Sequence, residues 1–216
     1  MTQHPLPVES FDLFPTHLKI FVFEDDPALN QALLRTARAE PELNASTSGK
    51  SVLARPEPWV ERLRGRFDRA LRCYLKGDTF PARADVYDIE AYAFFDHATG
   101  SSFTPVHDHL VEADLVAIYY ARAPERPERH DTSYYAMDGG LLVLHDPRLD
   151  ARTDRRGRTT RDHFRIYPRT NRMVVLPAGL RHSTTPSAGD ERLAVTCTVT
   201  VNRKDLFEGY VRYRLS

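Results

Sequence analysis

The chain has little cysteine, no excess of either charge and no long apolar segment. Its two cysteines, Cys73 and Cys197, are too few and too far apart for a disulfide framework or a cysteine-rich zinc site. Cys197 lies in an apolar segment, so we expect it to be a small buried core residue. The 30 basic residues balance the 30 acidic residues, which argues against a nucleic-acid-binding surface.

No apolar run approaches the roughly 20 residues needed to cross a membrane, and no basic region followed by an apolar run marks a secretion signal. We therefore expect a cytoplasmic protein with neither a membrane nor a nucleic acid as its partner. A length of 216 residues suits one domain with a sizeable core. The prediction is a single domain over 1–216, with a helical support region in 1–80 and a β core in 86–204.

The first 80 residues are predicted to be a helical region, with two helices separated by a polar loop at 44–50. Asp26 followed by Pro27 is typical of a helix start, because aspartate caps the free N–H groups and proline suits the first turn. Apolar residues then recur at helical spacing. A second amphipathic helix is predicted from 58 to about 76, with Gly77 as its stop.

From Val86 onward the apolar period changes toward two, which indicates strands. The predicted strands are 86–95, 115–121, 141–144, 164–167, 172–176 and 191–201. Short strands with turns between them predict an antiparallel sandwich or barrel. The last strand alternates, with Val195 and Cys197 on an apolar face and Arg192, Ala194 and Thr196 on a small, polar one. We expect its apolar face to pack on the helices and its polar face to line a ligand cavity.

Three histidines form the candidate metal site. His107 and His109 are two residues apart, so in an extended strand they point to the same side while Asp108 points away. His182 follows an apolar strand and a turn containing proline and glycine. Imidazoles with open positions suit Fe, Zn, Cu or Ni, and open positions favour Fe(II) and oxygen chemistry. The alternative is that all three are surface histidines in loops.

Arg192 is the candidate acid-binding residue, because a guanidinium can grip a carboxylate at two points. The alternative is a surface pair with Glu191 or Asp190. Two charged segments, 122–138 and 149–163, are expected to be loops at the barrel mouth. In the first segment, Arg122, Arg126 and Arg129 near Tyr134 and Tyr135 would suit an anionic or amino-acid-like molecule, with an ordinary solvated loop as the alternative. The arginines of the second segment form either a phosphate patch or, as we expect, a solvated loop.

These motifs resemble the 2-oxoglutarate- and Fe(II)-dependent oxygenases, specifically a subgroup with a His-x-His motif. The matching segments are 13–16, 29–33, 107–109, 117–120, 140–148 and 174–182, with Arg192 and Asn202. The spacing from His182 to Arg192 is the most specific part. The resemblance implies a mainly β protein with N-terminal helices, folded as a double-stranded β-helix, which is a jelly-roll, cupin-like barrel.

The resemblance also implies a dioxygenase with Fe(II), 2-oxoglutarate and O2 as cofactor and cosubstrates. His107, His109 and His182 would hold the iron, and Arg192 would bind the distal carboxylate of 2-oxoglutarate. The activity implied is oxidation of a C–H bond in a small-molecule or amino-acid-like substrate, usually hydroxylation, with release of succinate and CO2.

Two departures from the family pattern affect these assignments. The wider superfamily has His-x-Asp where this chain has His109, so Asp108 is the alternative second ligand; strand geometry favours His109. Many relatives carry a hydroxyl residue at the position of Ala194, and Thr196, on the same face, could replace it. Tyr119 or its neighbour Tyr120 is a further candidate to contact the cosubstrate, with a core position as the alternative.

Two other function classes stay open. The same histidines resemble the two motifs of the cupins, among which thiol dioxygenases use three histidines without 2-oxoglutarate. Against this, Glu112 falls short of the usual cupin glutamate spacing, and cupins have no reason to keep Arg192. The remaining class is a catalytically silent barrel that binds a small acid or a partner protein.

Overall fold

The structure is a computed structural model that describes residues 16–44, 49–76, 87–99, 102–124, 139–146, 163–187 and 191–203. Its helices are α1 (Pro27–Ala39) and α2 (Pro58–Leu75), with short 3-10 turns at Pro41–Asn44 and Val52–Ala54. Its strands are β1 (Lys19–Val22), β2 (Tyr87–Ala98), β3 (Leu115–Arg122), β4 (Leu142–His145), β5 (His163–Ile166), β6 (Arg172–Pro177), β7 (His182–Thr184) and β8 (Arg192–Arg203).

Helix α1 begins where the sequence predicts. The Asp26 carboxylate accepts a hydrogen bond of 2.9 Å from the backbone N–H of Leu29, and Pro27 occupies the first turn. Both helices bury one apolar stripe, which in α2 runs from Trp59 to Leu75. Gly77, the expected stop of the second helix, lies outside the described residues; α2 ends at Leu75.

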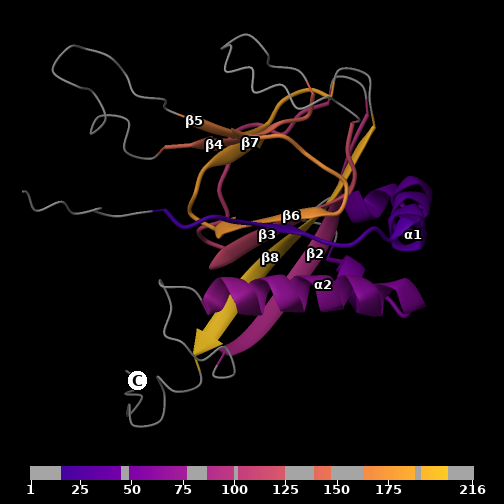
Figure 1. Ribbon diagram of the computed structural model, residues 1–216, viewed down its shortest axis with the longest axis horizontal. Helices are drawn as coiled ribbons and strands as arrows, with labels where there is room; N and C mark the ends of the chain where they lie inside the picture. Colours follow the sequence, from indigo (N-terminus) through magenta and orange to yellow (C-terminus); the bar gives the residue numbers. More distant parts are fainter. Residues whose placement is uncertain are drawn as a thin grey trace, which may run out of the picture.

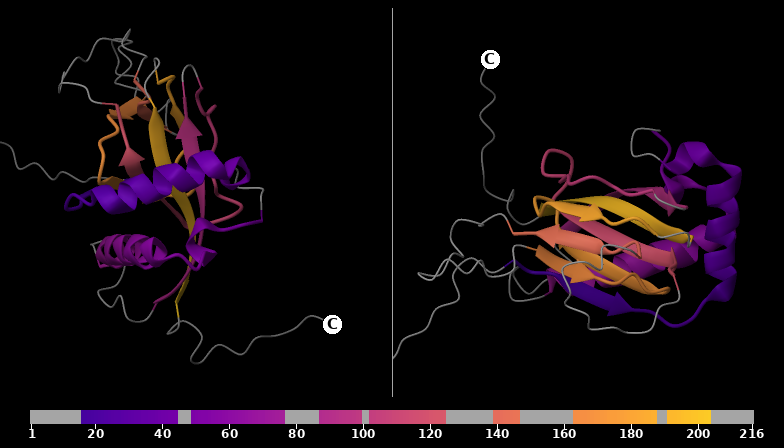
Figure 2. Two further views of the ribbon diagram at one scale, coloured as in Figure 1. Left: turned by 90° about the vertical axis from the view of Figure 1, so that its right-hand side faces the viewer. Right: turned by 90° about the horizontal axis from the view of Figure 1, so that it is seen from above.

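The strands form two antiparallel sheets. The larger has the order β1-β6-β3-β8-β2, and the smaller has the order β5-β4-β7. Figures 1 and 2 show the two sheets facing each other, with α1 and α2 on the outer side of the larger sheet. The expectation of a β-rich, antiparallel fold with N-terminal helices is therefore confirmed.

Two apolar clusters follow from this layering. The first lies between the helices and the larger sheet, and includes Phe67 of α2 with Val195 and Cys197 of β8. The second lies between the sheets, and includes Ile118 of β3, Leu142 of β4 and Ala194 of β8. Alternate residues of β8 thus belong to different clusters, because successive side chains of a strand point to opposite faces. The predicted packing of the last strand against the helices is confirmed.

Two strands correct the sequence-based expectation. The predicted helical region also contains a strand, because β1 (Lys19–Val22) pairs with β6 at the edge of the larger sheet. A short strand before a strong helix pattern has too few residues for its period to stand out. The second is β7 (His182–Thr184), which pairs with β4 and places His182 within a sheet. Among the described residues, no helix is both long and apolar enough to span a membrane.

Candidate metal centre

Backbone pairing brings the three histidines together. The N–H of His107 donates to the carbonyl of His182, and the N–H of His182 donates back to the carbonyl of His107, each at 2.9 Å. The N–H of His109 donates to the carbonyl of Ala178, also at 2.9 Å. The segment before β3 is therefore fixed against β7 and the turn before it, and this fixation does not depend on the side chains.

The three imidazoles face one another. Their ring centroids are 4.4 Å apart for His107 and His182, 5.0 Å for His107 and His109, and 5.4 Å for His109 and His182. One nitrogen from each ring lies within 4.8 Å of the others, a grouping that could hold one metal ion. His109 and His182 are buried, and His107 is half-buried.

Hydrogen bonds on the far side of two rings fix which nitrogen is free. The Nδ1 atom of His107 lies 2.8 Å from the carbonyl oxygen of Pro105, and that of His182 lies 2.9 Å from the carbonyl oxygen of Leu180. A carbonyl oxygen only accepts, so each Nδ1 carries the proton and each Nε2 presents a lone pair. This backbone support of the second nitrogen is typical of metal-binding histidines.

His109 completes the set. Its Nδ1 lies 3.5 Å from a carboxylate oxygen of Glu112, and its buried Nε2 has no hydrogen-bond partner among the described residues. A buried nitrogen without a partner is costly, and a metal ion bound at that lone pair would remove the cost. The donor set of three Nε2 atoms therefore fits a transition metal.

Burial also keeps two of the rings, those of His109 and His182, in the metal-binding form. Burial lowers the pKa of His182 to about 4. Burial likewise lowers the pKa of His109. A lowered pKa means that the neutral imidazole, which is the form that binds metals, predominates at pH 7.

Asp108, the alternative ligand, lies between the two histidines in the chain. It is exposed, and its carboxylate lies 3.3 Å from the backbone N–H of Leu110. The cluster of metal-ligating groups found among the described residues contains His109 and not Asp108. The geometry thus favours the three-histidine set.

The histidines lie in the wall of a cavity of about 330 Å³ between the two sheets. Thr196 of β8 is part of this wall, as the alternation of that strand predicts. The other lining residues are Asn44, Phe94, Phe95, Asp96, Thr104, Ile118, Tyr120, Leu142 and Thr184. The cavity therefore combines aromatic and aliphatic walls with the imidazoles and several other polar groups, which are its chemically active parts.

Arg192 lies buried beside this cavity, with 1% of its surface exposed. Its Nη2 lies 3.1 and 3.0 Å from the two carboxylate oxygens of Asp96, and its Nη1 donates to the carbonyl of Gly140 at 3.2 Å. The expected alternative, a surface pair with Glu191, is wrong. The Glu191 carboxylate instead pairs with Arg38, His97 and Arg122. Asp190 lies outside the described residues.

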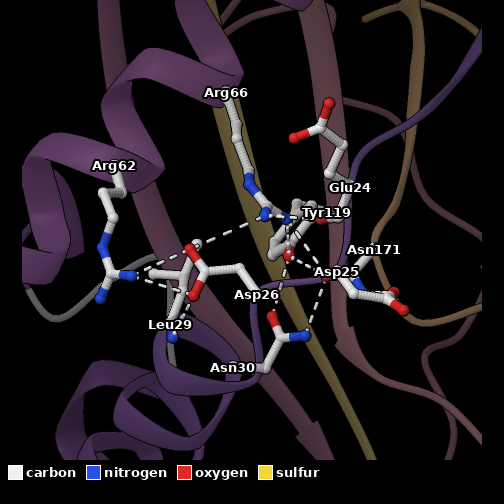
Figure 3. Close-up of polar contacts among 9 residues, drawn as sticks. All are labelled: Glu24, Asp25, Asp26, Leu29, Asn30, Arg62, Arg66, Tyr119 and Asn171. Atoms are coloured by element: carbon white, nitrogen blue, oxygen red, sulfur yellow. Dashed lines mark hydrogen bonds and ion pairs between the residues drawn. The ribbon is translucent and has the colours of Figure 1, made fainter.

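Tyr119 does not line the cavity. It points to the opposite face of β3, where its hydroxyl donates to either Asn30 (2.8 Å) or Asn171 (2.9 Å) and contacts the guanidinium of Arg66 (Figure 3). Asn171 has a positive φ of 63°, which asparagine tolerates better than most residues, and its side-chain oxygen sits at the centre of this network. Tyr119 therefore ties α1 and α2 to the sheet, and Tyr120, on the other face of the strand, lines the cavity.

Asp96 and Thr184 are cavity residues that the sequence analysis missed. Each lies within 3.5 Å of Arg192. The sequence pattern could have identified Asp96. It continues the alternation of the predicted strand 86–95 and falls on the same face as Phe94, which also lines the cavity. Most of the two expected loops at the cavity mouth, 125–138 of segment 122–138 and 149–162 of segment 149–163, lies outside the described residues. Their bounds are corrected at two positions, because Arg122 ends β3 and His163 begins β5.

Comparison with known proteins shows similarity of fold to solved structures, without a match at the level of sequence families. No family model matches the chain, and no curated protein matches it. Among solved structures, a prolyl-4-hydroxylase from Pseudomonas putida aligns with a TM-score of 0.56 and 16% identity, over 88% of this chain and 90% of that one. HygX from Streptomyces hygroscopicus, with nickel and 2-oxoglutarate bound, aligns with a TM-score of 0.53 and 14% identity, over 86% and 83%.

A third similar structure is a prolyl hydroxylase from Trichoplax adhaerens in complex with a peptide fragment of a hypoxia-inducible factor. It aligns with a TM-score of 0.54 and 10% identity, over 85% of this chain and 83% of that one. At such identities the comparison establishes a shared fold. It agrees with the resemblance found in the sequence, and the similar structures include some with iron or nickel and with 2-oxoglutarate bound.

Proposed function

We propose that this protein is a non-haem Fe(II)- and 2-oxoglutarate-dependent dioxygenase built on a double-stranded β-helix. The observation that carries the proposal is the convergence of three imidazole nitrogens on a cavity that has a buried arginine at its side. In this assignment His107, His109 and His182 hold the metal, and Arg192 binds the distal carboxylate of 2-oxoglutarate. The spacing from His182 to Arg192 and the shared fold support it.

The chain's own groups have defined tasks in this proposal. The bound iron, with 2-oxoglutarate and O2, supplies the oxidising chemistry, with succinate and CO2 as products. The backbone carbonyls of Pro105 and Leu180 hold two imidazoles in the tautomer that presents Nε2. Arg192 orients the cosubstrate, and Thr196 offers a hydroxyl on the same face of β8. The apolar wall excludes water from the reacting groups.

The cavity favours a small substrate, or one side chain of a larger one. Its volume of about 330 Å³ is near the lower end of small-molecule pockets, which are about 300–1,000 Å³. Phe94, Ile118 and Leu142 give it apolar walls. We propose oxidation, usually hydroxylation, of a C–H bond in a small-molecule or amino-acid-like substrate.

Two observations favour a second candidate, a three-histidine iron dioxygenase that does not use 2-oxoglutarate. The metal-ligating cluster found among the described residues contains no carboxylate, and Arg192 already has a carboxylate partner in Asp96. A catalytically silent acid-binding barrel would share the arginine but not need three free Nε2 atoms. We rank both below the oxygenase because neither accounts for both the histidine cluster and the buried arginine.

The test is to load the protein with Fe(II) without oxygen and titrate it with 2-oxoglutarate by calorimetry. Oxygen is then admitted without further substrate, and succinate is measured. The oxygenase should bind 2-oxoglutarate and form succinate slowly. Iron-loaded protein that binds no 2-oxoglutarate at millimolar concentration would refute the assignment and favour the second candidate. The His182→Ala variant is the control for contaminating activity.

A further inference from the structure

The carboxylate of Asp96 lies between the cavity and the guanidinium of Arg192. Asp96 lines the cavity and keeps 27% of its side chain exposed, whereas the Arg192 side chain is 1% exposed. Both carboxylate oxygens lie within 3.1 Å of the same nitrogen, Nη2. The acid-binding edge of the arginine therefore already has an acid on it, contributed by the chain itself.

Strand register produces this contact. In the β2–β8 ladder Asp96 is opposite Ala194, and Ala98 is opposite Arg192, so Asp96 and Arg192 are diagonal neighbours on one face. Diagonal cross-strand pairs are within reach of long side chains. Ala194, with only a methyl group as its side chain, lies between them on this face, so the Asp96 carboxylate can reach Arg192.

Of the other two guanidinium nitrogens, Nη1 is bound by the backbone, and the buried Nε has no hydrogen-bond partner among the described residues. Nη1 donates to the carbonyl of Gly140, and Nη2 also lies 3.5 Å from the hydroxyl of Thr184. Gly140 has a φ of +64°, and a Cβ there would come within 3.2 Å of Cδ of Arg192 and 3.1 Å of Oγ of Ser187. Because backbone and neighbours pack this closely, the arginine is confined, and the more exposed Asp96 is the partner that can move into the cavity.

We propose that Asp96 is an internal competitor for the acid-binding edge of Arg192, and that it sets which acids this protein accepts. The inference rests on the proposed function, because it concerns the residue that would bind 2-oxoglutarate. A ligand carboxylate needs both Nε and Nη2 for a two-point grip on that edge, and Asp96 already occupies Nη2. Two carboxylates cannot share Nη2 without repelling each other. Binding therefore exchanges one charge-assisted pair for another and lowers the net contribution of the distal carboxylate.

The test compares two ligands of equal chain length. 2-Oxoglutarate carries the distal carboxylate, and 2-oxopentanoate carries a methyl group in its place. Both are titrated by calorimetry into anaerobic Fe(II)-loaded wild type and into Asp96→Asn. The matched control is Asp68→Asn, which makes the same change in an aspartate that pairs with Arg72 on the exposed face of α2.

The internal competitor predicts a specific pattern. In the wild type, 2-oxoglutarate should bind less than about tenfold more tightly than 2-oxopentanoate. In Asp96→Asn, 2-oxoglutarate should gain about tenfold or more in affinity, as expected for a charged hydrogen bond that no longer has to be exchanged, while 2-oxopentanoate should change little. Asp68→Asn should match the wild type for both ligands.

Each other outcome overturns a defined part of the argument. If Asp96→Asn binds 2-oxoglutarate unchanged or more weakly, Asp96 positions Arg192 and does not compete; the proposed function then survives, provided that Arg192→Ala still weakens binding. If neither protein binds 2-oxoglutarate, the proposed function fails and the inference with it. Should Asp96→Asn not fold, the wild-type ratio decides alone, and a preference for 2-oxoglutarate above about 100-fold would refute competition.

Discussion

His107 and His182 are 75 residues apart in the chain, yet their backbones form a reciprocal pair in which each N–H donates to the other's carbonyl at 2.9 Å. The backbones of two candidate metal ligands are thus placed by main-chain hydrogen bonds. A side-chain substitution at either position leaves this bridge intact. Loss of metal in such a variant can therefore be assigned to the missing imidazole and not to a rearranged site.

The first prediction concerns the ligand set. Alanine at His107, His109 or His182 should abolish Fe(II) binding, because two imidazoles form too weak a site, whereas Asp108→Ala should bind nearly as the wild type does. Calorimetric titration with Fe(II) without oxygen, together with far-ultraviolet circular dichroism, measures affinity and folding. The reverse pattern, with iron lost in Asp108→Ala and kept in His109→Ala, would restore the histidine–aspartate pairing of the wider superfamily.

The second prediction concerns Arg192. Arg192→Ala should weaken 2-oxoglutarate binding by about 2 kcal/mol or more, because a charge-assisted contact is lost and Asp96 then faces the ligand without a counter-charge. Iron affinity should survive, since Arg192 is not among the candidate ligands. Titration of both ligands into one preparation checks the two parts together. Equal loss of iron and 2-oxoglutarate binding would indicate a collapsed cavity.

The third prediction tests the core between α2 and the larger sheet. Phe67 and Val195 are 2% and 0% exposed and belong to one apolar cluster. Alanine at either position should lower the free energy of unfolding by about 1–5 kcal/mol through cavity formation, with the larger loss at Phe67. Urea unfolding measures this. Val22→Ala, at a position that is 74% exposed, is the control and should unfold nearly as the wild type does.

The fourth prediction follows from His182, whose pKa burial lowers to about 4. The unfolded chain takes up a proton at this ring near pH 6.5, and the folded chain does so only near pH 4, so the unfolded state binds more protons in between. The contribution of His182 to the free energy of unfolding is therefore complete above about pH 6.5. It falls by about 3 kcal/mol as the pH is lowered toward 4.

Urea unfolding in the presence of a metal chelator, across pH 4 to 7, measures this dependence. The His182→Asn variant supplies the comparison, because it removes the titrating ring and keeps a polar side chain. Its stability should fall less steeply with acid than that of the wild type. If the free energy of unfolding depends on pH equally in the two proteins, the pKa of His182 is not lowered in the folded state.

The fifth prediction distinguishes the two thiols. Cys197 is buried in the first apolar cluster, and burial raises the pKa of its thiol to about 12, whereas Cys73 is exposed on α2. Because the thiolate is the reactive form, native protein should take up one iodoacetamide label, at Cys73, and unfolded protein should take up two. Mass spectrometry of the intact chain counts the labels, and a second label under native conditions would contradict burial of β8.

The elements of the fold could be predicted from sequence where a local pattern was long enough. Helix α1 has a cap, a proline and a periodic stripe, and β8 alternates over its whole length. The four residues of β1 and the three of β7 are too short to show a recognisable period. Both strands also pair with strands that are distant in the chain, which no local pattern reveals.

The site divides in the same way. His107, His109 and His182 were recognisable because residue type and spacing indicate metal chemistry. The Asp96–Arg192 pair was not, because its partners are 96 residues apart and meet only through the register of β2 on β8. Tyr119 and Tyr120 show the remaining difficulty. Sequence identifies both as strand residues, but the face of each is decided by how the sheet packs.

The alternation along β8 has a consequence for how this chain can change over evolution. Odd-numbered residues from Leu193 to Val199 support the core, and Arg192 and Thr196 belong to the cavity side. A substitution can therefore alter ligand recognition without touching the core packing. An insertion or deletion of one residue cannot, because it would exchange the two faces. We therefore expect β8 to tolerate single substitutions during evolution but not insertions or deletions.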